Sequence, residues 1–308
     1  MDPLSDILSL MKPRNLLAAG FEAGGEWAVR FPEARGTIKS GAVVTGACWL
    51  DVDGLPEPVR LESGDCFLLP MGRSFSLASG PNVEPVDGQT IFPRVRRGGV
   101  AMLNGGSDFS IVSARFALEG PQADMLLRLL PPVVHIRQGA DTAMLRWSTE
   151  RIMQELREAR PGNFLVIQYL AHMMLVQALR LHQSGAGDGV GWFFALADRQ
   201  MNAALEAMHA EPARRWSVEE LATRAGMSRS AFATRFREAV GAPPMEYLTR
   251  WRMLVGADRL AHSRDSIAEV ALALGYQSES AFSIAFKRVM GSSPRRYAAS
   301  AEAASRAA

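Results

Sequence analysis

The sequence predicts an α+β protein in which a β-rich N-terminal domain precedes an all-helical C-terminal domain. Its 308 residues exceed what one compact core usually needs, so the length favours two domains. From residue 21 to about residue 118, short apolar blocks alternate with Gly, Pro and Asp, a pattern typical of a sandwich or barrel. After residue 122, apolar residues recur every three or four positions, which indicates helices.

The composition is that of a folded protein and excludes several classes. Hydrophobic residues make up 48% and charged residues 21% of the chain. No apolar run approaches about eighteen residues, so we expect no transmembrane helix and no membrane partner. The N-terminus carries Asp2 and Asp6 but no basic stretch, which argues against a secretory signal. Two cysteines, Cys48 and Cys66, exclude a disulfide framework and favour a cytoplasmic location.

Helices are predicted from residue 122 to residue 183. The segment Phe164–Leu181 is apolar on most of its circumference, so it must be covered on more than one side. Two interpretations stay open, a dimerisation segment over residues 143–183 or a core helix packed on the β-domain. Residues 184–191, with the sequence SGAGDGVG, are predicted to be a flexible linker. The predicted organisation is a first domain over 1–183, this linker, a helical domain over 192–300 and a disordered tail over 301–308.

The C-terminal part of the chain repeats itself. Ser228–Tyr247 matches Ser278–Tyr297 after a shift of fifty positions, with Ser, Phe, Gly, Pro and Tyr in the same order. Each copy opens with a Ser followed three residues later by Glu, the capping box that starts a helix. A turn containing Gly and a second Ser-capped helix follow, so each copy is predicted to be a helix-turn-helix motif.

The second helix of each copy has the residues of a DNA-reading helix. Phe232 and Phe236, and likewise Phe282 and Phe286, fall on one side and should be buried. Small and polar side chains lie opposite, with an Arg or Lys that can reach bases or phosphates. One copy alone fits a helical interaction module equally well. Two copies in residues 212–300, which hold 14 Lys and Arg against 8 Asp and Glu, favour a duplex as the partner.

Residues 244–262 are predicted to form one helix between the two motifs, spanning roughly 25–30 Å at 1.5 Å per residue. Two reading helices at its ends can meet successive major-groove turns, about 34 Å apart, on one face of double-stranded DNA. Basic residues flanking the motifs are candidate phosphate contacts. The predicted DNA-contacting residues are Arg229, Ser230, Ala233, Thr234, Arg235, Arg237, Arg250, Arg252, Glu279, Ser280, Ser283, Ile284, Lys287, Arg288, Arg295 and Arg296.

The stretch Met201–Ala298 resembles the AraC/XylS family of bacterial transcription regulators, most specifically from Ile267 to Tyr297. The N-terminal part resembles the cupin-type sensor domain of an AraC subgroup through Gly46–Leu50, Leu61–Asp65 and Leu130–His135. The resemblance implies a cupin-like β-barrel with a helical dimerisation segment, joined to a DNA-binding domain. It further implies a homodimeric, effector-responsive activator of promoters that contacts RNA polymerase, with repression as the alternative.

The sequence departs from the family pattern in its reading helices. Family members often carry Arg two residues after the buried hydrophobe, where this chain has Thr234 and Ile284. The working hypothesis is therefore base recognition by Ser230, Thr234, Ser280 and Ser283, with Ile284 against a thymine methyl group.

An enzyme with a β-barrel active site is the competing hypothesis. Cupin enzymes hold a divalent ion with several His and a carboxylate, whereas none of the five His lies between residues 21 and 118. We therefore expect no metal, no cofactor and no catalytic residue. A thiol switch at Cys48 and Cys66 is less favoured than burial of both thiols, because no basic residue adjoins either one.

The predicted barrel is the expected place for a small-molecule effector. Several aromatic and basic residues are candidates to line a pocket, with core packing as the alternative for the aromatic ones. These candidates are Trp27, Phe31, Trp49, Phe67, Arg73, Phe75 and Arg94.

Overall fold

The computed structural model describes residues 2–92, 99–106, 108–118, 127, 130–185 and 192–307. The chain divides into two compact units. The β-unit comprises Pro13–Leu118 and Pro131–Gly185, and the helical unit comprises Met1–Lys12, Glu119–Leu130 and Ala186–Ala308. This pairing of a β-rich unit with an all-helical one confirms the predicted α+β class. The first twelve residues group with the helical unit, whereas the sequence analysis assigns them to the first domain.

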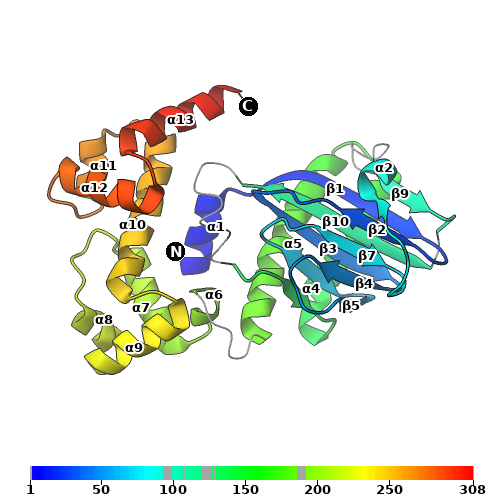
Figure 1. Cartoon of the computed structure of the whole chain (residues 1–308), viewed down its shortest axis with the longest axis horizontal. Helices are drawn as coiled ribbons and strands as arrows, with labels where there is room; N and C mark the ends of the chain where they lie inside the picture. Colours follow the sequence, from blue (N-terminus) through cyan, green and yellow to red (C-terminus); the bar gives the residue numbers. More distant parts are fainter. Residues whose placement is uncertain are drawn as a thin grey trace. The chain divides into compact units, whose positions relative to one another are not determined.

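The β-unit is built from two sheets (Figure 1). One has six strands in the order β11-β6-β3-β10-β1-β9, and the other has five in the order β5-β4-β7-β2-β8. Most neighbours pair antiparallel, although β1 with β9 and β2 with β8 pair in parallel. The strands are β1 (Arg14–Ala23), β2 (Ala28–Phe31), β3 (Thr37–Thr45), β4 (Ala47–Val52), β5 (Val59–Glu62), β6 (Cys66–Leu69), β7 (Phe75–Ala78), β8 (Val86–Asp87), β9 (Val100–Leu103), β10 (Phe109–Ala117) and β11 (Val134–Ile136).

Apolar side chains from both sheets meet in one core. Phe21 and Ile111 come from the six-stranded sheet, and Leu50 and Leu77 come from the five-stranded one. Trp27 packs edge-on against Phe21, with 5.3 Å between the ring centroids. Because each strand turns alternate side chains inward, short apolar blocks are enough to close this core. Two short helical segments, α2 (Gly88–Ile91) and η2 (Ala140–Thr142), join the strands and helices of the unit.

Two long helices, α4 (Ala143–Glu158) and α5 (Asn163–Gly185), pack against the six-stranded sheet (Figure 1). A glycine in β1 lets α4 approach closely. A Cβ at Gly20 would lie 2.9 Å from Val100 and 3.1 Å from the Sδ atom of Met153. The helix α5 continues to Gly185, so it includes the first two residues of the predicted linker.

The helix α5 is more apolar than the sequence analysis allows. Over Asn163–His182 it is long and apolar enough, by length and composition, to cross a membrane, which corrects the expectation that no such stretch exists. Core helices of soluble proteins pass the same test. Only 33% of this stretch is buried, and Phe164, Leu165 and Tyr169 are exposed. Much of its apolar surface is thus uncovered in a single chain.

The helical unit contains both copies of the repeat. The helix α10 (Pro244–His262) has its predicted bounds, and the two motifs lie at its opposite ends (Figure 1). The last helix continues through Ala307, so the described part of the predicted disordered tail is helical. The remaining helices are α1 (Pro3–Met11), α6 (Trp192–Ala195), α7 (Arg199–Ala210), α8 (Val218–Arg224), α9 (Arg229–Val240), α11 (Ile267–Ala273), α12 (Glu279–Met290) and α13 (Pro294–Ala307).

The N-terminal helix α1 packs on α7 and α10 through Leu4, Ile7 and Met11. The Nδ1 atom of His209 on α7 lies 3.1 Å from a carboxylate oxygen of Asp6, and its Nε2 atom lies 2.6 Å from the hydroxyl of Tyr247. Burial lowers the pKa of His209, so the neutral ring donates from Nδ1 to Asp6 and accepts from Tyr247. This buried imidazole therefore connects α1, α7 and α10.

Replacing Asp6 with Ala leaves the buried N–H of His209 without its acceptor. We expect the free energy of unfolding of the helical unit to fall by about 1–3 kcal/mol. Denaturant unfolding followed by tryptophan fluorescence measures this, because the ring of Trp251 stacks on His209 with 3.8 Å between centroids. Ser9→Ala, on the exposed side of α1, is the matched control. Equal midpoints for the two variants would show that the Asp6–His209 contact is not stabilising.

Candidate functional site

The helix α9 is held at both ends and along one side, which leaves its outer face free. The Ser228 side chain accepts from the backbone N–H of Ala231, and Gly241 ends the helix with a positive φ of 81°. Phe232 and Phe236 are fully buried. The predicted contact residues Arg229, Ser230, Thr234 and Arg237 are exposed, and Ala233 is half-buried.

The helix α12 repeats this arrangement. Ser278 caps it, Gly291 ends it with a φ of 75°, and Phe282 and Phe286 are fully buried. The side chain of Ile284 is 72% exposed, an unusual position for an isoleucine in a folded domain. Of the other predicted contacts on this helix, Glu279, Ser280, Lys287 and Arg288 are exposed and Ser283 is half-buried.

The capping and turn geometry of both motifs agrees with the sequence analysis. Ser217 and Glu220 form a complete capping box at α8, and Ser266 and Glu269 form one at α11. Hydrogen bonds from Ser lower the pKa of both glutamates, which keeps them ionised at the positive ends of these helices. The first helix of each motif is therefore fixed before the reading helix begins.

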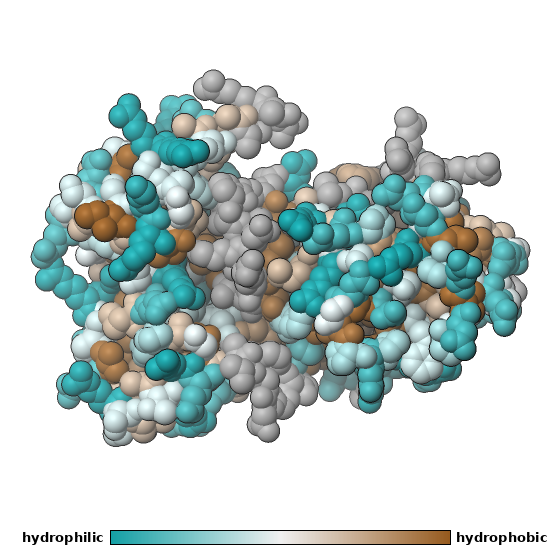
Figure 2. Space-filling view, viewed as in Figure 1, coloured by the Kyte–Doolittle hydropathy of each residue, from teal (hydrophilic) through white to brown (hydrophobic). Residues whose placement is uncertain are grey.

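Most predicted basic contacts are free to meet an anion. Six of them form no ion pair within the described part of the chain. These six are Arg229 and Arg237 on α9, Lys287 and Arg288 on α12, and Arg295 and Arg296 on α13. The space-filling view shows a largely hydrophilic surface over α11 and α12, interrupted by hydrophobic side chains (Figure 2).

Three predicted arginine contacts already have partners within the described part of the chain. Arg252 is half-buried and donates to the backbone carbonyls of Pro212 and Arg214, at 2.5 and 2.7 Å, and burial lowers its pKa. Its guanidinium therefore links α10 to the segment before α8 through hydrogen bonds, which argues against the predicted phosphate contact. Two further arginines pair with acids. Arg235 binds Asp198, the N-cap residue of α7, at 2.6 Å, and Arg250 pairs with Glu246 at 2.5 Å.

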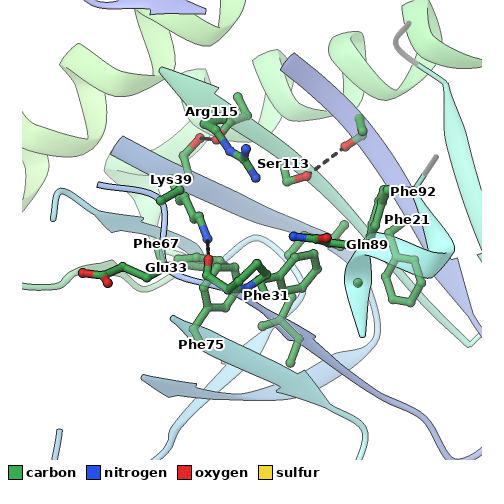
Figure 3. Close-up of a pocket in the computed structure, with 18 residues that line it drawn as sticks. Phe21, Phe31, Glu33, Lys39, Phe67, Phe75, Gln89, Phe92, Ser113 and Arg115 are labelled. Carbon is green, nitrogen blue, oxygen red and sulfur yellow. Dashed lines mark hydrogen bonds between the residues drawn. The ribbon is translucent and has the colours of Figure 1, made fainter. Parts of the chain in front are cut away.

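The β-unit encloses a cavity of about 370 Å³ between its sheets (Figure 3). This volume lies in the range of small-molecule sites. Aromatic rings form most of its wall, and Phe31 stacks on Phe75 with 4.7 Å between centroids. Polar groups reach it from β3, β10 and α2, where Lys39, Arg115 and Gln89 lie (Figure 3).

Comparisons with known proteins bear on both units. Residues 2–184 match the cupin family model, and residues 221–300 match the helix-turn-helix domain model. AraC-like transcription regulators of Streptomyces lividans and Streptomyces antibioticus are each 44% identical over 299 residues, which cover 96% of this chain and 98% of theirs. The chain belongs to the AraC family of transcription regulators. It is a DNA-binding transcription factor, as the sequence analysis expects.

A solved structure similar to part of this AraC-family chain is the DNA-binding domain of AdpA, a global transcriptional factor, in complex with a target DNA. The sequence identity is 36%, the TM-score is 0.32, and the match covers 32% of this chain and 90% of that one.

The predicted effector residues of this regulator divide between the cavity and other places. Phe31, Phe67 and Phe75 line the cavity. Trp27 is buried in the core against Phe109, at 4.7 Å between centroids. The other predicted residues lie elsewhere: Trp49 faces the guanidinium of Arg60, Arg73 lies near Gly54, and Arg94 is outside the described residues.

Sequence reasoning missed the polar side of this cavity. Lys39 and Arg115 each occupy one position in an otherwise apolar or neutral strand, which was the available signal. Their proximity follows only from the register of β3 on β10, where the two residues are direct partners. Phe21, Phe92 and Gln89 were likewise not predicted to line it.

The cysteines and histidines of this regulator offer little chemistry. Burial raises the pKa of both Cys48 and Cys66 to about 12, so neither is a thiolate near neutral pH, which argues against a thiol switch. Among the residues that the structure describes, no three His, Cys, Asp or Glu side chains group together as metal ligands. His135 lies 3.2 Å from the buried carboxylate of Asp65, which also accepts from the backbone N–H of Gln138.

Proposed function

We propose that this AraC-family chain is an effector-responsive activator that binds promoter DNA through α9 and α12 and has no catalytic activity of its own. The observation that carries the proposal is a reading helix with buried phenylalanines and unpaired outward cations, which occurs twice in one compact unit. Surface cations of this kind neutralise DNA phosphates and release their counterions.

The spacing of the motifs supports a direct, non-palindromic site. The 19 residues of α10 span about 28 Å at 1.5 Å per residue. That length is close to one turn of B-DNA, about 34 Å, so the reading helices can occupy successive major grooves. Arg295 and Arg296 at the start of α13 position the second motif through phosphates, without reading sequence.

The regulator is expected to act in the cytoplasm, to bind a small-molecule effector in the β-unit and to contact RNA polymerase once bound at a promoter. Activation is the expected sign because it is the commoner behaviour implied by the family resemblance. The cavity between the sheets supports the effector site.

A homodimer is the expected assembly. Phe164, Leu165 and Tyr169 expose large apolar surfaces on α5, and only 33% of its apolar stretch is buried in one chain. Exposed apolar faces of this kind mark interaction surfaces in soluble proteins. A two-fold dimer covers such a face with the same face of a second copy.

Lys287→Ala tests the phosphate contact at α12. Each neutralised phosphate contributes about 0.9 to the slope of log affinity against log salt. Removal of one contact should lower that slope by about 1 for every duplex sequence. Fluorescence anisotropy on a labelled random-sequence duplex between 50 and about 200 mM salt measures it. Arg137→Ala, an exposed cation in the β-unit, is the control. An unchanged slope for the Lys287 variant would place α12 away from the phosphates.

Ile284→Ala tests base reading. If the isoleucine packs on a thymine methyl group, its removal should relax the preference at one base pair and leave the others unchanged. Selection from a random duplex pool, followed by sequencing, reports this for the wild type and the variant. Leu272→Ala is matched to it, because Leu272 is 67% exposed but lies on α11 rather than on the reading helix. Weaker binding that is equal on all sequences would contradict the base contact.

Leu165→Glu and Tyr169→Glu test the dimer. A carboxylate on this face cannot be buried without a partner, so each variant should shift the mass measured by light scattering from dimer to monomer. Val86→Glu is the control, since Val86 is 45% exposed in β8, away from α5. A dimeric mass for both α5 variants would assign the association to another surface.

A further inference from the structure

Two like charges face each other inside the cavity of the β-unit. In the antiparallel pair of β3 with β10, Lys39 is the direct partner of Arg115. Like charges at directly opposed positions of a sheet are destabilising. The Lys39 side chain is only 5% exposed, so solvent does little to screen the repulsion.

No carboxylate compensates these charges within the described part of the chain. The Nζ atom of Lys39 donates to the backbone carbonyl of Pro32 at 2.7 Å and lies 4.9 Å from the ring centroid of Phe75. Glu33 also lines the cavity, but its carboxylate pairs with Arg35 at 3.1 Å and points away from Lys39 (Figure 3). Among the described residues, the two cations of the cavity therefore have no carboxylate partner.

The unfavourable environment of the Lys39 ammonium group is reflected in its pKa. Burial, with the charge of Arg115 second, lowers the pKa of Lys39 to about 8. Between this value and its ordinary value of 10.5, the unfolded chain binds more protons than the native chain. Lys39 thus makes the native state less stable below pH 8 than above it. An anion beside the ammonium group would reverse this penalty.

Apart from Gln89, Glu33 and two serines, the rest of the wall is apolar. Phe21, Phe67 and Phe92 complete the aromatic surface around the stacked pair of Phe31 and Phe75. The hydroxyls at the wall are already engaged, since Ser40 donates to the carbonyl of Ala114 and Ser113 to that of Ala19. A sugar or a polyol would find few partners here, and a polar phosphate ester would place its body against phenyl rings.

We propose that this cavity binds a monocarboxylic acid with an apolar body, its carboxylate between Lys39 and Arg115 and its body among the phenylalanine rings. An arginine can hold both carboxylate oxygens, and the lysine adds a point charge on the other side. This inference rests on the proposed function only where it identifies the acid as the effector of the regulator. The binding itself is measurable without DNA.

The test is thermal unfolding of the full chain with two acids, 4-phenylbutyrate and octanoate, and with their uncharged primary amides. The acids should raise the midpoint by several degrees and the amides should not, because only a ligand that binds the native state stabilises it. The two acids distinguish an aromatic from an aliphatic body. Equal shifts for acids and amides, or no shift with either acid, would overturn the proposal.

Variants separate binding from a structural role. Lys39→Met and Arg115→Met should each weaken acid binding at least about tenfold, equivalent to about 1.4 kcal/mol. Arg60→Met, an exposed cation of the same unit, should leave binding unchanged. In the absence of acid, Lys39→Met should not lower the midpoint, since it removes the repulsion. If the acids still raised the unfolding midpoint of both cavity variants, the proposal would be wrong.

Protonation provides a readout that a structural lysine would not give. At pH 8, acid binding should take up about half a proton, because Lys39 is about half neutral there, and at pH 6.5 it should take up almost none. Calorimetry in buffers of different ionisation enthalpy measures this uptake, which Lys39→Met should abolish. The other charged groups that line the cavity are Arg115 and Glu33. The absence of uptake at pH 8 would show that the bound group does not meet Lys39.

A DNA-binding assay with and without the acid keeps the two proposals distinguishable. Acid binding with unchanged affinity for DNA supports the carboxylate site and counts against the effector role. Failure of the acid to bind, while the salt dependence on DNA stays steep, overturns the carboxylate site alone.

Discussion

Each reading helix is fixed by the contact of its second phenylalanine with a tyrosine of the following helix. Phe236 packs edge-on against Tyr247 at 5.9 Å between centroids, and Phe286 packs against Tyr297 at 5.4 Å. A helix turns by 100° per residue, so a slip of one position would move the phenylalanine out of its socket and the exposed face into the core. This contact therefore decides which side chains DNA meets.

The anchoring extends from this contact to the start of the chain. The hydroxyl of Tyr247 binds His209, whose ring stacks on Trp251 and binds Asp6 of α1. The two motifs share one design for the reading helix, and His209 connects the first of them to the N-terminal helix of the chain.

The local features of this fold could be predicted from the sequence, and the long-range ones could not. The capping boxes at Ser217 and Ser266 and the helix end at Gly241 depend on residues within one or two turns, so a pattern identifies them. The internal repeat of the C-terminal part also predicted the helix-turn-helix motif and its buried phenylalanines. Asp6 and His209 are 203 positions apart, and no periodicity relates them.

The same limit explains why the sequence could not tell which basic residues have partners within the fold. Arg252 and Lys287 are both basic residues on predicted helices, but Arg252 has backbone carbonyls as partners some 40 positions away. Their different roles appear only once the helices pack. The cavity is a similar case, because Lys39 and Arg115 become neighbours through strand register rather than sequence spacing. A single lysine in an apolar strand is visible in the sequence. The arginine that lies opposite it on the neighbouring strand is not.

In the part of the chain that the structure describes, both units of this regulator present cations without an anionic partner, and the physical setting of the two sets differs. The unpaired cations of the helical unit are exposed, so ions screen them and their attraction to phosphate weakens as salt rises; they are Arg229, Arg237, Lys287, Arg288, Arg295 and Arg296. Lys39 is buried beside Arg115, where mobile ions have little access. A carboxylate held there would be much less sensitive to salt than DNA on the helical unit. Occupancy of the β-unit can thus stay constant across ionic conditions that change the affinity for the promoter by orders of magnitude, which suits a site that reports a metabolite rather than the salt concentration.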